Sequence, residues 1–373
     1  MPCPSRTGSH DADVARIASA WDPCLAAGMG AALSALTVAG PGLHGRLGGG
    51  ALIAVFAVGS IGALAATRLG ETANQNTALL IILMSALTMR LGLLVTEPTL
   101  SGDIYRYIWD GRVQAAGINP YRYVPTASEL GSLRDADIWP KINRASYAVT
   151  IYPPVAQAVF LAMTRVGESV VTIKAGLLTF ETAAIAAMIA LLARLGLPAT
   201  RVAAYVWHPL PVWEIAGNGH VDAVMLALLL IGLLAFLRGN TLAAGLLVTL
   251  GALVKPVALL MLPVLWRPWN WRLPLVVDAT IAVAYLPFIS VGTGVLGFLP
   301  DYLREEGFTS GAGCKLLWLV ENFSGPLAHD VAAFVAVSAV VLAGLALAIG
   351  FRSDRSSEAS LHAASLVPCS SRS

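Results

Sequence analysis

Long runs of hydrophobic residues, separated by short polar segments, fill the chain from near residue 25 to near residue 350. A helix that crosses the hydrocarbon core of a bilayer needs ~20 mostly apolar residues. Runs close to that length occur at 25–43, 49–67, 77–96, 170–194, 201–216, 221–237, 273–291 and 329–350. The pattern therefore predicts an all-α, multi-pass membrane protein.

A further apolar run, 241–266, carries Lys255 and Pro256 at its middle. As a single helix it would bury a lysine in the membrane and bend at the proline. As two halves it would form a broken hairpin with Lys255 at its tip, because at ~1.5 Å per residue neither half spans the ~30 Å core. We favour the hairpin because it places the flanking arginines on one side of the membrane. These arginines are Arg6, Arg16, Arg68, Arg194, Arg201, Arg238, Arg267, Arg272, Arg352 and Arg355.

The resulting topology has ten membrane-entering segments and both termini in the cytoplasm. We expect a cytoplasmic segment at 1–22 without a signal-peptide pattern, one membrane domain over 23–352, and a disordered serine-rich tail at 353–373. The opposite, non-cytoplasmic face would carry two external segments, 97–153 and 292–328.

The composition agrees with a membrane protein and argues against a soluble enzyme, a nucleic-acid-binding protein and a zinc- or disulfide-stabilised domain. Hydrophobic residues make up 57% of the chain, charged residues only 12%, and the mean hydropathy is +0.72, which is too apolar for a soluble enzyme. The net charge of +2 leaves no basic excess for nucleic-acid binding. The cysteines are scattered and indicate neither a zinc site nor a disulfide framework; they are Cys3, Cys24, Cys314 and Cys369.

The external segment 97–153 holds the best candidates for catalysis. Its run SGDIYRYIWDGRVQAAGINPYRYVP predicts a helix that begins at Asp103 and ends at Gly117. Asp103 and Asp110 are seven residues apart, nearly two helical turns, so both carboxylates share one face of that helix. The same face carries Arg106 and Tyr107.

Structural roles for these residues stay open. Asp103 could serve only as a helix N-cap, and Asp110 could serve only as the ion-pair partner of Arg106 or Arg112. Further along the segment, the motif Tyr152-Pro153-Pro154 could simply be a proline-stiffened entry into an interfacial helix at 155–166.

Several ionisable residues fall within or beside the predicted spans, where such groups are costly and often functional. Arg90 could snorkel to the membrane surface, and Asp222 could interact only with the dipole of its own helix. Lys255 at a helix break is harder to explain structurally. The remaining polar residues of this kind are His208, Glu214 and His220. The sequence contains no nucleophile triad motif, P-loop or dinucleotide-binding glycine pattern.

As a set, these motifs resemble the external-loop signature of GT-C superfamily membrane glycosyltransferases: an Asp, an aromatic helix, a second Asp, Gly-x-Asn-Pro-Tyr and a later Tyr-Pro-Pro. The resemblance is strongest across 85–310. The first mannosyltransferase of GPI-anchor synthesis and bacterial polyprenol-phosphate-mannose-dependent mannosyltransferases look like this. The resemblance also includes Trp207-His208-Pro209, Gly219-His220-Val221-Asp222 and Leu253-Val254-Lys255. Two departures are the three apolar helices before the loop and the single helix after residue 328.

The resemblance implies a GT-C-like helical bundle in the cell membrane that moves a hexose, most simply mannose, from a polyprenyl-phosphate sugar to a lipid-linked or glycan acceptor. Asp103 is then the general base by position, with Asp110 as a second catalytic residue. The substrate-binding residues would be Arg106, Tyr107, Arg112, Tyr152, His220, Asp222 and Lys255. We expect no cofactor and no metal. The expected partners are the polyprenyl-phosphate sugar donor, the glycan or lipid acceptor and membrane lipids, and nucleic acid is not among them.

The chemistry is consistent with this assignment. A phosphate leaving group needs no general acid. The acceptor hydroxyl does need a general base, which typically raises the reaction rate ~10²–10⁴-fold. The cations available to the departing phosphate would be Lys255, Arg90 and Arg106. Two alternatives stay open: a transporter or flippase for lipid-linked sugars, and a non-catalytic subunit of a glycan-assembly complex.

Overall fold

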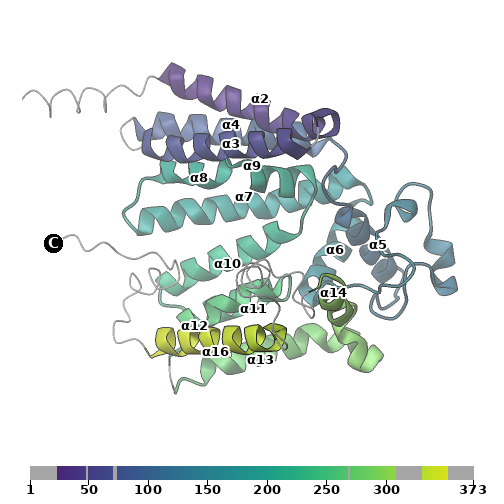
Figure 1. Ribbon diagram of the computed structural model, residues 1–373. Coiled ribbons are helices and arrows are strands. Elements are labelled where there is room, and N and C mark those ends of the chain that lie inside the picture. Colours follow the sequence, from purple (N-terminus) through teal and green to yellow (C-terminus); the bar gives the residue numbers. More distant parts are fainter. Residues whose placement is uncertain (1–22, 48, 70–73, 268, 308–329, 352–373) are drawn as a thin grey trace, which may run out of the picture. The chain divides into compact units, whose positions relative to one another are not determined.

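The computed structural model describes residues 23–47, 49–69, 74–267, 269–307 and 330–351. These residues form helices, turns and loops and contain no β-strand, which confirms the predicted all-α fold (Figure 1). The predicted segment 1–22, the tail 353–373 and most of the second external segment lie outside the described residues. The chain divides into two compact units, Met1–Ile104 with Ser169–Ala227, and Tyr105–Glu168 with Leu228–Ser373.

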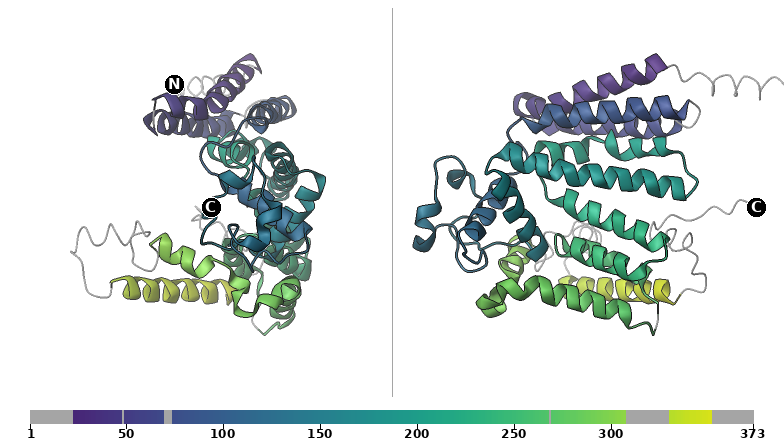
Figure 2. Two further views of the ribbon diagram at one scale, coloured as in Figure 1. Left: turned by 90° about the vertical axis from the view of Figure 1, so that its right-hand side faces the viewer. Right: turned by 180° about the vertical axis from the view of Figure 1, so that it is seen from behind.

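The first unit is a stack of helices that lie side by side (Figures 1 and 2). Its core contains two buried indoles, and each connects neighbouring helices through a hydrogen bond. Trp207 Nε1 donates to the carbonyl of Ile82 at 2.9 Å, and Trp213 Nε1 donates to the carbonyl of Thr37 at 2.8 Å. The helices are α2 (Pro23–Leu47), α3 (Gly49–Leu69), α4 (Gln75–Leu94), α7 (Val170–Arg194), η3 (Ala199–Val202), α8 (Ala203–Val206), α9 (Pro209–Pro211) and the π-helix η4 (Val212–Gly217).

The predicted span 201–216 is not one regular helix. Pro209 and Pro211 cannot donate backbone hydrogen bonds, so the chain breaks into short helical pieces there. His208 caps the first piece after the break, because its Nδ1 accepts the N–H of Leu210 at 3.2 Å. Helix α10 (Asp222–Leu237) follows after a bend of 119°.

The second unit contains most of the external segment, from Tyr105 onward, and the C-terminal helices. The polar part consists of α5 (Asp103–Ala115, whose first two residues belong to the first unit), η1 (Ser128–Leu133), η2 (Trp139–Lys141) and α6 (Pro154–Val166). The apolar part consists of most of α10, then α11 (Thr241–Ala252), η5 (Pro256–Met261), α12 (Leu262–Leu265), α13 (Arg272–Tyr285), η6 (Leu286–Leu296), α14 (Leu299–Glu305) and α16 (Asp330–Gly350).

The run 241–266 folds back on itself at Lys255, as the hairpin prediction requires. Ala244 and Val248 of α11 pack in one buried cluster with Leu265 of α12. In one continuous helix Ala244 and Leu265 would be ~30 Å apart, at ~1.5 Å per residue. The backbone of Lys255 is extended, with φ −140° and ψ 124°, which separates the two halves.

Helices capable of crossing a membrane are present in both units. Among the described residues three helical stretches are long and apolar enough: Gln75–Leu94, Val170–Arg194 and Arg272–Glu305. A fourth crossing arises if the bent pair Pro209–Gly217 and Asp222–Leu237 forms one span. Shorter apolar helices occupy the positions of the other predicted runs. The ten-segment topology stays a prediction.

Candidate active site

Helix α5 begins at Asp103 and ends before Gly117, as the sequence predicts. Ser101 Oγ accepts the N–H of Asp103 at 3.2 Å, which satisfies one of the unpaired donors at the helix start. Gly117 adopts φ +77° and donates its N–H to the carbonyl of Gln114, a conformation that favours glycine. Asp103 is half-buried, whereas the side chain of Asp110 is almost completely buried.

Both carboxylate oxygens of Asp110 have hydrogen-bond donors. Arg106 Nε donates to Oδ1 at 2.8 Å, and Gln157 Nε2 donates to Oδ2 at 3.0 Å. Gln157 is itself held by Thr150, whose Oγ1 lies 2.7 Å from Nε2. Arg106 is 5% exposed and also donates to the carbonyl of Ala148. This network ties α5 to α6 and to the end of the external segment.

Tyr107 belongs to a packed cluster of three aromatic rings. Its ring stacks on Phe160 of α6 at a centroid distance of 4.4 Å and meets the edge of Tyr152 at 5.0 Å. Tyr152 and Phe160 also meet edge to face, at 5.3 Å. Tyr107 is 1% exposed, so its ring fixes the position of half-buried Tyr152 rather than presenting a free surface.

The motif Tyr152-Pro153-Pro154 meets the break at Lys255. The carbonyl of Leu253 accepts the N–H groups of Val155 at 3.1 Å and Ala156 at 3.3 Å, so the hairpin tip caps the start of α6. This contact brings together two motifs that lie about a hundred residues apart in the sequence. The interfacial helix predicted at 155–166 is confirmed as a helix, Pro154–Val166.

Tyr121 is a member of this site that sequence analysis missed. Its hydroxyl donates to the carbonyl of Tyr152 at 2.6 Å. Burial, together with the nearby Tyr285 and Asp110, raises the pKa of Tyr121 well above its usual value. The phenol therefore stays neutral and keeps donating. The signal in the sequence was its place in the Asn-Pro-Tyr motif.

Arg112 lies apart from this cluster. Its guanidinium pairs with Glu168 at 2.9 Å and with Asp135 at 2.5 Å. Burial favours a higher pKa for Asp135, but the backbone N–H groups of Trp139 and Ile138, with Arg112, outweigh it and lower that pKa to about 2. Arg112 therefore holds the fold of the external segment.

In the first unit, His220 lies between two carboxylates. Its Nε2 is 3.4 Å from Glu214 and its Nδ1 is 3.8 Å from Asp222. The backbone N–H of His220 donates to the carbonyl of Glu214 at 2.9 Å, which closes the turn before α10. Two predicted site residues, His220 and Asp222, are thus brought together. Within the described part of the chain, no group of three His, Cys, Asp or Glu residues has the arrangement of a metal site.

Arg90 does not snorkel, which corrects one expectation from the sequence. It is 5% exposed, and its Nε and Nη2 bind the two oxygens of Glu181 at 2.9 and 2.7 Å. Its Nη1 donates to the carbonyl of Val206, next to the proline break. With Arg90 bound to Glu181 and Arg106 bound to Asp110, neither is an open cation for a phosphate group.

Sequence analysis also missed two charged residues of the run 170–194. Glu181 is 1% exposed and Lys174 is completely buried. Both were detectable as isolated charges in an otherwise apolar span, which are costly unless paired. Their partners lie in other elements of the first unit, and sequence spacing alone does not indicate them.

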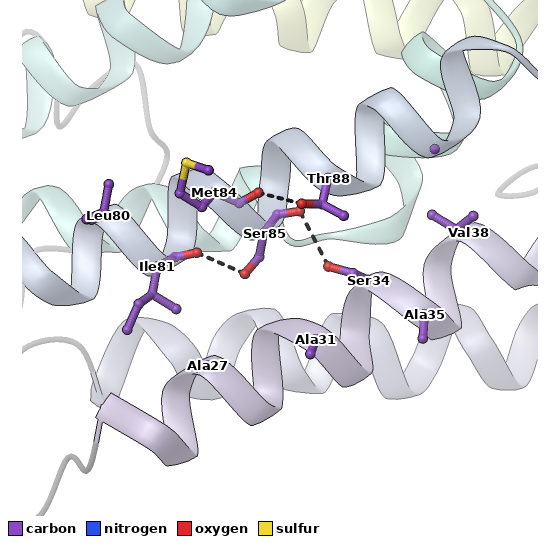
Figure 3. Close-up of a pocket in the computed structure, with 11 residues that line it drawn as sticks. Ala27, Ala31, Ser34, Ala35, Val38, Leu80, Ile81, Met84, Ser85 and Thr88 are labelled. Atoms are coloured by element: carbon purple, nitrogen blue, oxygen red, sulfur yellow. Dashed lines mark hydrogen bonds between the residues drawn. The ribbon is translucent and has the colours of Figure 1, made fainter.

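A groove of about 710 Å³ between α2 and α4 has a different character (Figure 3). No charged side chain lines it. Its hydroxyl groups already donate to carbonyls within the helices: Ser85 to Ile81 at 2.9 Å and Thr88 to Met84 at 2.9 Å (Figure 3). The groove therefore offers apolar contact but no group for acid–base chemistry.

Comparison with known proteins gives one match. Residues 21–271 match the family described as alpha-(1->6)-mannopyranosyltransferase, N-terminal domain. No curated protein and no solved structure matches the chain. The matched region covers more than half of the chain and contains α5, the Tyr-Pro-Pro motif, the His220 cluster and Lys255. Together with membrane-length helices and two carboxylates on one face of α5, it shows that the chain belongs to the alpha-(1->6)-mannopyranosyltransferase family.

Proposed function

We propose that this protein is a GT-C-type enzyme that transfers mannose from a polyprenyl-phosphate donor to a lipid-linked or glycan acceptor, with Asp103 as the general base. The observation that supports this role is the contrast between the two carboxylates of α5. Asp110 is only 1% exposed, whereas Asp103 is half-buried at the start of the helix and therefore partly accessible. A base must reach the proton that it removes.

The proposed reaction is a direct displacement. The acceptor hydroxyl oxygen attacks the anomeric carbon of mannose and forms the new glycosidic bond. The bond between that carbon and the phosphate oxygen breaks, and polyprenyl phosphate leaves with the electron pair. Asp103 takes the hydroxyl proton. Because the oxygen attacks the anomeric carbon from the side opposite the leaving phosphate, the anomeric configuration inverts. Asp110 contributes by holding Arg106 and Gln157, which organise the helix that carries the base.

The arginine distribution along the sequence supports one orientation in the membrane. We propose that the external segment and the tip at Lys255 face the non-cytoplasmic side, where a lipid-linked donor presents its sugar. A cysteine introduced at the exposed Gly131, in a variant without the native cysteines, should react with an impermeant thiol reagent from that side only. Reaction from the cytoplasmic side would contradict this orientation.

The experiment that tests the function supplies purified protein with an acceptor extract and a panel of polyprenyl-phosphate sugars. We expect release of polyprenyl phosphate with the mannose donor and not with the glucose or galactose donor. Release must depend on the acceptor, because the hydroxyl is the nucleophile. Movement of the donor across a vesicle membrane without release of polyprenyl phosphate would support the transporter alternative instead.

We further propose that Lys255 binds the donor phosphate. It lies at a helix break, where its backbone is extended, and the neighbouring Leu253 carbonyl accepts the first N–H groups of α6. Lys255→Ala should raise the KM for the donor by ~10-fold or more, since a charged hydrogen bond contributes ~1.5–3 kcal/mol. Lys255→Arg should restore only part of the donor affinity, because guanidinium and ammonium differ in shape and hydration.

Initial rates against donor concentration measure this effect. Arg267→Ala is the matched control, because it removes an exposed cation after the second half of the same hairpin. An unchanged donor KM in Lys255→Ala would reduce Lys255 to a structural lysine.

A further inference from the structure

The position of Asp103 depends on an irregular segment. Helix α4 ends at Leu94 and α5 begins at Asp103, and the residues between them form turns and bends without a regular helix. Such a segment supplies few backbone hydrogen bonds of its own, so other elements must accept its N–H groups and donate to its carbonyls. The groups that do so set where the first turn of α5 lies.

One side chain accepts three of these N–H groups. Asn218 Oδ1 receives hydrogen bonds from the backbone N–H of Thr99 at 3.0 Å, Leu100 at 2.8 Å and Ser101 at 3.3 Å. Asn218 is 1% exposed, and its Nδ2 donates to the carbonyl of Trp213 at 2.8 Å. Its amide therefore joins the π-helix to the three residues that lead to Gly102 and Asp103.

Lys174 holds the other end of the same segment. Its buried ammonium donates to the carbonyls of Leu93 at 3.2 Å and Thr96 at 2.6 Å, just where α4 ends. The segment is thus bound through its carbonyls at one end and through its N–H groups at the other. Lys174 comes from α7 and Asn218 from the turn after the π-helix η4, both in the first unit.

Gly219 brings the turn against the first turn of α5. It has φ +73°, and a Cβ atom at this position would collide with the side chain of Ile104, the residue after Asp103. The positive φ favours glycine here, and any larger residue would also force the Ile104 side chain to shift. The turn 217–220 therefore contacts the chain on both sides of Asp103, through Asn218 before it and through Gly219 after it.

We propose that Asn218 is a positioning residue that orients Asp103 for catalysis. The proposal rests on the assignment of Asp103 as the base. Asn218 does not touch the reacting atoms; it fixes the backbone of 99–101, which carries the base into place. A misplacement of ~1 Å at a reacting group can cost ~10²-fold in rate. The loss should therefore appear in kcat rather than in donor binding.

The test compares Asn218→Ala with Asn218→Asp. The alanine variant lacks the acceptor, so we expect kcat to fall by ~10–10² while the donor KM changes little. Hydrogen exchange of a peptide covering 97–103 should become faster. The aspartate variant keeps an acceptor oxygen for the three N–H groups but loses the donor to Trp213, so it should recover part of kcat and of the protection.

Asn74→Ala is the matched control. Asn74 is exposed at the opposite end of α4, where its Oδ1 accepts the N–H groups of Asn76 and Thr77. The same chemical change there should leave kcat and the exchange of 97–103 as in wild type. A general effect of losing a capping amide would instead appear in both alanine variants.

Wild-type kcat in Asn218→Ala would overturn the proposal, and so would a loss that appears only in the donor KM. If Asn218→Ala does not fold, Asn218→Asp decides: fast exchange of 97–103 with unchanged kcat overturns it. Failure of the base assignment is distinguishable, because Asp103→Asn would then keep turnover. Failure of the proposed function is distinguishable as well, because wild-type protein would release no polyprenyl phosphate.

Discussion

Turnover of Asp103→Asn should fall by ~10² or more at saturating donor and acceptor, with little change in donor affinity. The amide cannot take the proton of the acceptor hydroxyl, so the chemical step loses its base. The amide oxygen can still serve the start of α5, so folding should be nearly intact. The measurement is the rate of polyprenyl phosphate release, with the thermal midpoint in detergent as the stability check.

Two further variants separate the roles of the acidic residues. Asp137→Asn is the matched control, because Asp137 is an exposed carboxylate of the same external segment, and turnover should stay at the wild-type level. Asp110→Asn should lower turnover less than Asp103→Asn does. It should lower the stability more, because Arg106 then keeps its buried charge without a carboxylate partner.

Near-wild-type turnover in Asp103→Asn would exclude Asp103 as the base and favour Asp110 or a transport function. Turnover and stability lost together would support the alternative that Asp103 is only an N-cap. A cap contributes only ~1 kcal/mol, but it can matter in a marginally stable segment. The two quantities must therefore be measured on the same preparation.

Glu181→Gln should produce the largest loss of stability in the first unit. It leaves the Arg90 guanidinium buried without a counter-charge, and breaking a buried pair typically costs ~3–5 kcal/mol. Both side chains are nearly inaccessible, and the pair binds through two N–H···O contacts of 2.9 and 2.7 Å. The thermal midpoint in detergent should fall clearly, and protein yield should fall with it.

Glu168→Gln is the matched control for this prediction. Glu168 also pairs with an arginine, but its side chain is 41% exposed, so its loss should cost at most ~1 kcal/mol. Combining Glu181→Gln with Arg90→Gln should recover part of the stability, because the unpaired buried charge is removed. Equal midpoints in Glu181→Gln and Glu168→Gln would show that the buried pair contributes no more than a surface pair.

Local features of the fold could be predicted from the sequence because they depend on neighbours in the chain. The start of α5 at Asp103 follows from Ser101-Gly102 before it, and its end from a glycine with positive φ. The break at Lys255 follows from Pro256, whose ring prevents a regular helix from continuing. The apolar runs have helical length because backbone groups in a membrane must pair within their own segment.

The sequence by itself determined the helical class, the hydrophobic runs and the residues that carry charge, since each depends on composition or on spacing within one segment. Only the tertiary structure decided which polar groups pair. Arg90 binds Glu181, which is 91 positions away in the sequence, and Asn218 accepts the N–H of Thr99, which is 119 positions away. Such pairs have no common spacing in the chain, because their distance is set by how helices pack. Tertiary packing also buries Asp110 more deeply than Asp103, because Gln157, which binds the Asp110 carboxylate, comes from another helix.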